Sequence, residues 1–315
     1  MFWISLGQMA VMASFILIGL ILVKVKVLDQ GSSKILSKLE NSIFIPALAM
    51  GTFITNFTRE KVGIAWKLLL FSFAVLLVVI PIAILCARLA TGSDYIRKIY
   101  TYGLSFANFG FMGFPVVAAL FPQYNMYYMI FTLPLWTLIY VWGVPSLLMS
   151  DGNEKKGIAS KLKALVNPMF IAMIIGAIIG ICGIKIPDFA LNVINTCSEC
   201  MSPIAMIITG ITFASISLKK VLSDLSIYFV TLVRLILIPL LFGGIYILCV
   251  KLFSLDIPEY YFACMICSLI MPLGLNTVVI PAAYGRDTSV AAGMALVSHV
   301  LSLITVPLML MLFGF

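Results

Sequence analysis

Charged side chains are scarce in this sequence. Of 315 residues, only 10% are Asp, Glu, Lys or Arg and one is His, whereas 63% are apolar. The mean hydropathy of +1.16 corresponds to more apolar surface than one globular core of this length could bury. The composition therefore excludes a soluble globular protein and predicts an all-α polytopic membrane protein.

The sequence also lacks the motifs of several functional classes. It has no G-x-x-x-x-G-K-[ST] phosphate loop and no cytosolic domain, which excludes an ATP-driven pump. The single His and the absence of H-E-x-x-H argue against an intramembrane enzyme. A channel would need a continuous polar stripe or a ring of charges, and the sequence shows neither. A membrane receptor, or a channel-like protein without coupled transport, stays open as the alternative to a carrier.

Cysteines are present but do not suggest a metal site. Two pairs have C-x-x-C spacing, Cys197 with Cys200 and Cys264 with Cys267. A zinc site needs such pairs on closely apposed polar loops. Here each pair lies on one face of an apolar helix, so packing between membrane helices explains them better. We expect no metal and no cofactor.

Apolar runs between charged residues are long enough to cross a hydrocarbon layer of ~30 Å. The first run is preceded by no Lys or Arg and is too long for the core of a signal peptide, so we expect a true first helix. The runs predict ten helices of about 20 residues each. Their ranges are 1–23, 41–58, 68–87, 99–150 (two helices), 164–184, 200–218, 225–250, 260–285 and 288–315.

One polar linker, residues 150–166, divides the chain near its middle. Five expected helices lie in residues 1–149 and five in residues 167–315. An odd number per half predicts that duplicated halves would be inverted relative to each other. A constant half-chain offset aligns Pro46 with Pro203 and Pro115 with Pro272. These matches favour an inverted repeat.

Lys and Arg concentrate in the loops on one side of the expected helices, the side that includes the 150–166 linker. Because cytoplasmic loops carry an excess of basic residues, this side is expected to face the cytoplasm. Both termini are then extracellular, and the protein is a multi-pass protein of the cytoplasmic membrane. The net charge of +8 is explained by inner loops facing anionic lipid of the bilayer, not by binding of nucleic acid.

Two expected helices contain residues that helices disfavour. The fourth reads NFGFMGFP over 108–115, and the ninth reads MPLGLNTVVIP over 271–281. Matching Gly and Pro interruptions in two halves are typical of a transporter site. A broken helix directs the N–H groups of its second half at the break, so two inverted copies would favour an anion near the membrane midplane.

These segments resemble a known family. NFGFMGFPVVAALF is similar to the fourth-helix motif of the auxin efflux carrier family, and residues 271–308 are similar to its last two helices. VNPMFIAMIIGAIIGI resembles the start of its second half, and IFIPALAMGTF resembles its second helix. The family includes bacterial malate and malonate permeases and plant PIN-type auxin carriers. The resemblance implies ten helices in a 5+5 inverted repeat with broken, crossing helices four and nine.

The resemblance also implies a function and site residues. It implies a secondary transporter of a small organic anion, a mono- or dicarboxylate, that works by alternating access around the crossover. Asn108 matches the residue that contacts the carboxylate, and Pro115 and Pro272 match the crossing prolines. Phe109 stands where the family has a small residue, which leaves the pocket size open. The residues expected at the substrate site are Asn108, Gly110, Gly113, Pro115, Pro272, Gly274, Asn276 and Thr277.

We expect Gly110 and Gly113 to let the fourth helix unwind and Pro115 to restart it. Three ionisable residues within expected helices are candidates for ion coupling: Glu199, Arg234 and His299. Glu199 is predicted to open the seventh helix. Arg234 could pair with a carboxylate, snorkel or have a structural role, and His299 could carry a proton or bridge helices.

Glu40 is expected at the cytoplasmic start of the second helix. The sequence does not reveal the substrate, the direction of transport, the coupling ion or the oligomeric state. A homodimer is compatible with it.

Overall fold

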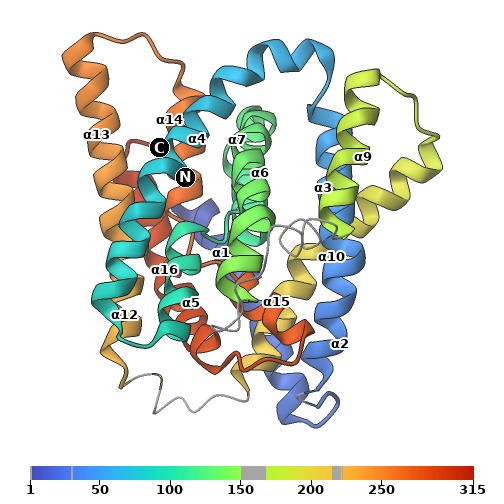
Figure 1. Cartoon of the computed structure of the whole chain (residues 1–315), viewed down its shortest axis with the longest axis vertical. Coiled ribbons are helices and arrows are strands. Elements are labelled where there is room, and N and C mark those ends of the chain that lie inside the picture. The colour runs from blue at the N-terminus through green and yellow to red at the C-terminus, as the bar shows by residue number, and fades with distance from the viewer. Residues whose placement is uncertain (1, 30, 150–167, 215–220, 222) are drawn as a thin grey trace.

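The structure is a computed structural model that describes residues 2–29, 31–149, 168–214, 221 and 223–315. In these residues the chain forms helices joined by short connections, with no β-strand, which confirms the all-α prediction (Figure 1). The predicted linker over 150–166 lies outside the described residues. The helices are α1 (Phe2–Lys24), α2 (Ser32–Leu39), η1 (Glu40–Phe44), α3 (Ile45–Asn56), α4 (Arg59–Ala90), α5 (Asp94–Ser105), η2 (Phe109–Gly113), α6 (Phe114–Leu120), η3 (Pro122–Tyr124), α7 (Asn125–Leu138), η4 (Ile139–Leu148), α9 (Pro168–Cys182), α10 (Asp188–Phe213), α12 (Leu225–Leu232), η5 (Val233–Leu237), α13 (Ile238–Phe253), α14 (Glu259–Leu269), α15 (Asn276–Ala283) and α16 (Ser289–Leu312).

Six of the described helical stretches are long and apolar enough to cross a membrane. They are Phe2–Lys24, Ala65–Ala90, Pro122–Leu148, Asp188–Phe213, Leu225–Phe253 and Ser289–Leu312. Two shorter apolar helices span Phe109–Leu120 and Pro168–Cys182. The ranges predicted for the fourth and ninth helices are interrupted, because α5 stops before η2 and α14 stops before α15.

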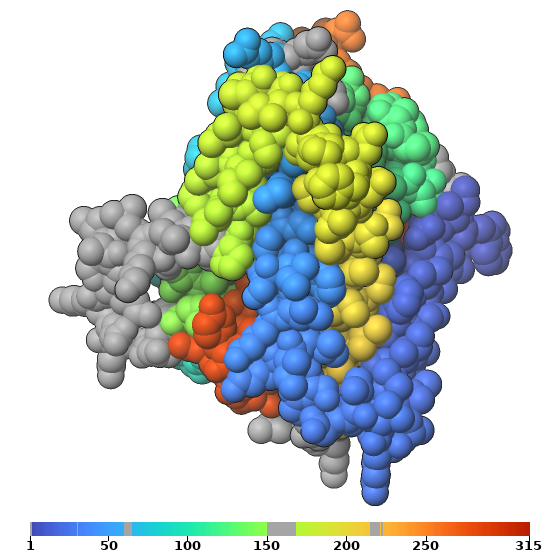
Figure 2. All heavy atoms as spheres, turned by 90° about the vertical axis from the view of Figure 1, so that its right-hand side faces the viewer, coloured from blue at the N-terminus to red at the C-terminus, as the bar shows by residue number. Residues whose placement is uncertain are grey.

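Small residues allow the closest helix contacts. A Cβ atom on Gly19 of α1 would lie 2.2 Å from the carbonyl oxygen of Ile207 in α10. Reciprocally, a Cβ on Gly210 of α10 would lie 2.0 Å from the carbonyl oxygen of Ile16. Such backbone-to-backbone approach is how membrane helices gain dispersion contacts without a hydrophobic driving force. Figure 2 shows α3 lying between α9 and α10 on one face of the molecule, with α1 beside α10.

Two predicted helix starts are wrong. We expected a helix to begin near residue 200, but α10 begins at Asp188. Its first half lies at the periphery of the molecule (Figure 1), and its residues are exposed or only partly buried. Glu40 was expected at a helix start, but α2 begins at Ser32 and continues through η1 into α3, so that Glu40 is inside the helix. In both cases a charged residue was read as a helix end, although a helix can continue past it.

Four described segments, η1, η2, η4 and η5, are π-helical, with one extra residue in the turn. A π-segment is rare and frequently lies at a functional site. Here these segments carry or adjoin Glu40, Asn108, Tyr140 and Arg234, which are buried polar residues.

Candidate functional site

Two interrupted helices cross at the centre of the molecule. Between α5 and η2 residues 106–108 are not helical, and between α14 and α15 residues 270–275 are not helical. Ala107 and Leu273 form an isolated antiparallel bridge. The backbone N–H of Asn108 donates to the carbonyl oxygen of Pro272 at 2.8 Å. The two breaks thus satisfy part of each other's backbone, as non-helical backbone at membrane depth requires.

Gly274 permits this approach. A Cβ atom at this position would lie 2.3 Å from the carbonyl oxygen of Phe106. No real Cβ tolerates that distance from backbone, so any larger residue would push the two breaks apart. Pro272 also lies at the crossing, where its carbonyl accepts from the backbone N–H of Asn108.

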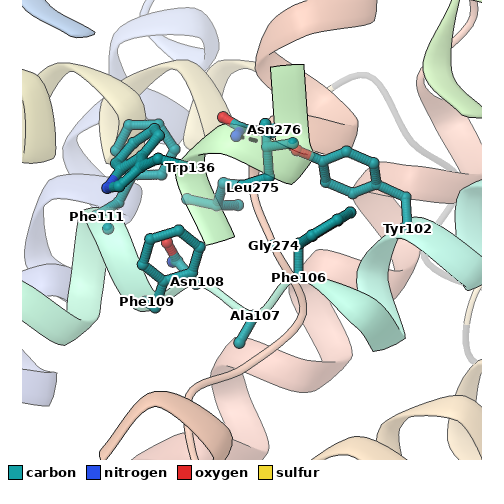
Figure 3. A pocket seen from close by; sticks show the side chains of 12 residues that line it. Tyr102, Phe106, Ala107, Asn108, Phe109, Phe111, Trp136, Gly274, Leu275 and Asn276 are labelled. Carbon is teal, nitrogen blue, oxygen red and sulfur yellow. Dashed lines mark hydrogen bonds between the residues drawn. The ribbon is translucent and has the colours of Figure 1, made fainter. Parts of the chain in front are cut away.

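A narrow pocket lies against the crossing (Figure 3). Its walls come from the end of α5, from both breaks, and from α7 and η4. The lining residues include no charged side chain, and their polar side chains are those of Tyr102, Asn108, Asn276 and Trp136. Aromatic rings form much of the wall, and Phe109 meets Trp136 edge to face with ring centroids 5.3 Å apart. The pocket therefore combines apolar, mostly aromatic walls with a small number of amide groups.

Asn108 stands at the start of the second half of the first broken helix and is 2% exposed. Its amide nitrogen lies 2.9 Å from Nε2 of His299 on α16. His299 Nδ1 lies 2.7 Å from the carbonyl oxygen of Ala295. The Oδ1 atom of Asn108 is buried and has no hydrogen-bond partner. The histidine thus bridges α16 to the pocket, which is one of the two interpretations that the sequence left open.

Asn276 occupies the corresponding place in the second broken helix, at the first residue of α15. Its amide nitrogen donates to the hydroxyl of Tyr102 at 3.1 Å, and its Oδ1 atom is also buried without a partner. Thr277 does not line the pocket, because its hydroxyl donates back to the carbonyl oxygen of Gly274 at 2.8 Å. Thr277 therefore stabilises the turn before α15, whereas Asn276 reaches the pocket.

The predicted roles of Gly110, Gly113 and Pro115 need correction. The helix does not unwind at these residues: the break spans residues 106–108, and residues 109–120 are continuously helical. Gly110 lines the pocket against Trp136, and a Cβ on Gly113 would lie 2.1 Å from the hydroxyl oxygen of Tyr128. Both glycines make room for aromatic side chains.

Pro115 lies in this helix and not at the crossing. Having no N–H, it leaves the carbonyl of Phe111, four residues earlier, without its helical donor. The hydroxyl of Ser202 on α10 donates to that carbonyl oxygen instead. Pro115 therefore creates a link between the broken helix and α10.

Arg234 is 1% exposed and contacts backbone, not a carboxylate or solvent. Its Nη1, Nη2 and Nε atoms donate to the carbonyl oxygens of Leu104, Ser268 and Met271 at 3.0, 2.9 and 3.2 Å. Two of these carbonyls belong to the last turns of α5 and α14, whose free C=O groups carry partial negative charge. The guanidinium thus caps both first half-helices behind the crossing, which favours the structural role.

Glu199 lies apart from this cluster. Its side chain is exposed on the first half of α10, and it does not line the pocket at the crossing. The structure thus brings His299 to the pocket and Arg234 to the breaks, but it leaves Glu199 on the surface. Among the described residues, no group of three or more His, Cys, Asp or Glu side chains could hold a metal ion.

Sequence reasoning missed Glu40 as a buried group. The residue is 0% exposed, and neither of its carboxylate oxygens has a hydrogen-bond partner. The hydroxyls of Ser37, three residues earlier, and of Tyr140 are also buried without partners. Because Ser37 and Glu40 are three residues apart, a helix read as continuous from Ser32 would have placed both on one inner face.

A family model described as membrane transport protein matches residues 4–310. The chain belongs to that family. The match confirms the resemblance to the auxin efflux carrier family that the motifs indicated.

An uncharacterized transporter of Methanothermobacter thermautotrophicus (strain Delta H) is 25% identical over 308 residues, covering 93% of each chain. The chain is therefore a multi-pass membrane protein of a transport family, and its similarity to the archaeal transporter extends across both broken helices.

Proposed function

We propose that the protein is a secondary transporter of a small organic anion, a mono- or dicarboxylate, that works by alternating access around the crossing. The observation that carries the proposal is the placement of Asn108 and Asn276. Each stands where the second half of a broken helix begins, and both line one pocket. The proposal includes ten membrane helices in a 5+5 inverted repeat, with residues 1–149 and 167–315 as the two halves.

The chemistry of the crossing favours an anion. The first N–H groups of a helix have no intrahelical acceptor and carry partial positive charge. Residues 109–120 start at the pocket, so this helix directs such groups towards it. In α15, which also starts there, the N–H groups of Thr277 and Val278 donate to the carbonyls of Gly274 and Leu275, so Asn276 is the donor it offers. Each Asn amide nitrogen has one hydrogen-bond partner and can donate a second N–H. A carboxylate is the organic anion that fits paired N–H donors.

Within this class, the lining favours a single carboxylate with an apolar body. A dicarboxylate would bring a second charge into a pocket whose lining residues carry no Lys or Arg. Burying that charge without a partner is costly. The aromatic walls instead fit an apolar group.

The location follows from the basic loops. We propose the cytoplasmic membrane, with the 150–166 linker inside and both termini outside. The exposed apolar face of α9 and the exposed first half of α10 are compatible with a homodimer.

A thermal-shift screen of the purified protein tests the substrate class. Benzoate and acetate are expected to raise the melting temperature, benzoate more strongly, because a ligand of the folded state stabilises it by mass action. Succinate is expected to have a smaller effect, and benzylamine, a cation of similar shape to benzoate, none. Stabilisation by benzylamine and not by benzoate would contradict an anion site.

Flux separates a carrier from the alternative of a receptor. Proteoliposomes that contain the protein are expected to accumulate labelled benzoate faster than protein-free liposomes. Binding without flux would favour a receptor, and a conductance without saturation would favour a channel-like protein.

A further inference from the structure

The contact between Asn108 and His299 has a defined direction. A backbone carbonyl only accepts, so the short contact to Ala295 places the proton of the neutral imidazole on Nδ1. Nε2 then carries the lone pair and accepts from the Asn108 amide nitrogen at 2.9 Å. With neutral His299, the amide is therefore held with its nitrogen towards α16, while its oxygen stays buried without a partner.

In this arrangement Asn108 has only one N–H left for an incoming carboxylate. The unpartnered Oδ1 of Asn108 is an acceptor in a pocket proposed to receive another acceptor. The same holds at Asn276, whose nitrogen is directed to Tyr102. Of the two partners, only His299 can change from a hydrogen-bond acceptor to a donor at physiological pH, because it can take up a proton.

We propose that His299 is a proton-dependent positioning residue that turns the Asn108 amide, so that the anion and one proton bind together. This rests on the proposed function of the pocket. When Nε2 takes up a proton from water, both ring nitrogens become donors and Nε2 faces the Asn108 nitrogen, which is also a donor. Rotation of the amide by half a turn brings Oδ1 onto the Nε2 proton and turns both N–H bonds towards the pocket.

The rotation is accessible and resolves the unsatisfied group. The terminal torsion of Asn is broad and roughly two-fold, so the rotated amide needs no new backbone conformation. The buried Oδ1 gains a donor that carries charge, and the carboxylate gains two N–H donors. The bond between Nδ1 and Ala295 is unchanged, because Nδ1 donates in both states.

The surroundings of His299 make the anion the counter-charge. α16 packs against α1, α10, α12, α15 and η5. The buried half of α10, from Met201 to Phe213, and α15 carry no ionisable side chain, and the nearest acid next to α12, Asp224, is bonded to Ser226. The ionisable groups on the packed elements are Lys24 at the end of α1, Asp188, Cys197, Glu199 and Cys200 on the outer half of α10, Tyr228 on α12, and Arg234 on η5.

Arg234 is a cation, so it opposes protonation of His299, while no acid in the described residues faces the ring to favour it. A bound carboxylate would favour protonation of His299. Proton and anion therefore promote each other's binding, and by linkage the effect is equal in both directions. A monocarboxylate then crosses with one proton and no net charge.

The single histidine of the chain allows a direct test, because ¹⁵N-histidine labelling gives one imidazole in the purified protein. Without ligand at pH 7.5, the ring is expected to be neutral with its proton on Nδ1, and saturating benzoate is expected to shift it towards the protonated form. A proton on Nε2 in the free protein, or no response to bound benzoate, would overturn the proposal.

Calorimetry with benzoate gives the second readout. Uptake of one proton makes the Kd rise about tenfold per pH unit between pH 6.5 and 8.5. Experiments in two buffers of different ionisation enthalpy should report uptake of about one proton per benzoate. His299→Gln should bind benzoate with little pH dependence and no proton uptake. Glu40→Gln is the matched control, because it removes a buried ionisable group outside the pocket and should keep the proton uptake.

The outcomes separate the two proposals. Benzoate binding without proton uptake in the wild type would overturn the proposed role of His299 but would still support the anion site. Loss of proton uptake in Glu40→Gln, with uptake kept in His299→Gln, would also overturn that role. If no carboxylate bound between pH 6.5 and 8.5, both the proposed function and the proposed role of His299 would be contradicted.

Discussion

At the scale of residues, buried amides and ionisable groups decide what the crossing can bind. Asn108, Asn276 and Glu40 each keep buried oxygen atoms without hydrogen-bond partners. Such atoms are costly inside a protein and rare in native structures, so they identify places where a ligand, a proton or a rearrangement supplies what is missing. Two of these residues line one pocket, and the third lies on η1.

Asn108 gives the most direct prediction. Asn108→Ala is expected to raise the Kd for benzoate roughly 10- to 150-fold, because a hydrogen bond to a charged group contributes about 1.5–3 kcal/mol. Asn108→Asp should bind more weakly still, since its charge opposes the anion. Calorimetry measures both, with the melting temperature as the folding control. Wild-type affinity in both variants would show that the anion site lies elsewhere.

Glu40 gives a prediction about stability. The buried carboxyl is expected to stay neutral in the folded protein, whereas an exposed Glu ionises above about pH 4.3. Folding then holds a proton that the unfolded chain releases, so stability should fall as pH rises. Glu40→Gln removes this dependence and should raise the melting temperature by at least about 2 °C at pH 8, with little change at pH 5. Glu199→Gln, an exposed control, should change neither value.

At the scale of elements, the broken helices explain which sequence predictions succeeded. Gly, Pro and Asn at 108–115 and 271–281 correctly indicated two interrupted helices, because those residues weaken a helix wherever it lies. The position of the first break could not be predicted. Residues 106–108 are stabilised by Pro272 and Leu273, which are distant in sequence, and no local propensity encodes that pairing.

Mutations at Pro115 and Gly274 distinguish a residue inside the helix from a residue at the break. Pro115→Ala restores an N–H for the Phe111 carbonyl and is expected to change the benzoate Kd by less than about threefold. Gly274→Ala forces a methyl group against the Phe106 carbonyl and should cost about 1–3 kcal/mol of stability, seen as a lower melting temperature and weaker binding. If Pro115→Ala abolished binding and Gly274→Ala were harmless, the assignment of the break would be wrong.

At the scale of the whole molecule, composition alone predicted the class, since 63% apolar residues require a bilayer. Contacts between distant segments could not be derived in this way. His299 and Asn108 are 191 positions apart, and Arg234 reaches both α5 and α14. A lone histidine in an apolar run has the same local sequence whether it faces a pocket, a helix or lipid.

Orientation is also a property of the whole molecule. In a variant without the seven native cysteines, Ser160→Cys is expected to resist a membrane-impermeant thiol reagent in intact cells and to react after permeabilisation. Ser160 belongs to the predicted linker, outside the described residues. Ser254→Cys, on the opposite side of the predicted topology, should react with the reagent in intact cells. Labelling of Ser160→Cys from outside would invert the proposed orientation.

The crossing also has a consequence for biosynthesis. The first break donates its Asn108 N–H to Pro272, and the Leu104 carbonyl accepts from Arg234, 130 residues later in the chain. While the ribosome is still making the second half, these polar groups have no partner of their own, and lipid offers none. The nascent first half must therefore shield them with water, with other backbone or with an insertion chaperone. The chain completes its first break only when the residues of the second have entered the bilayer.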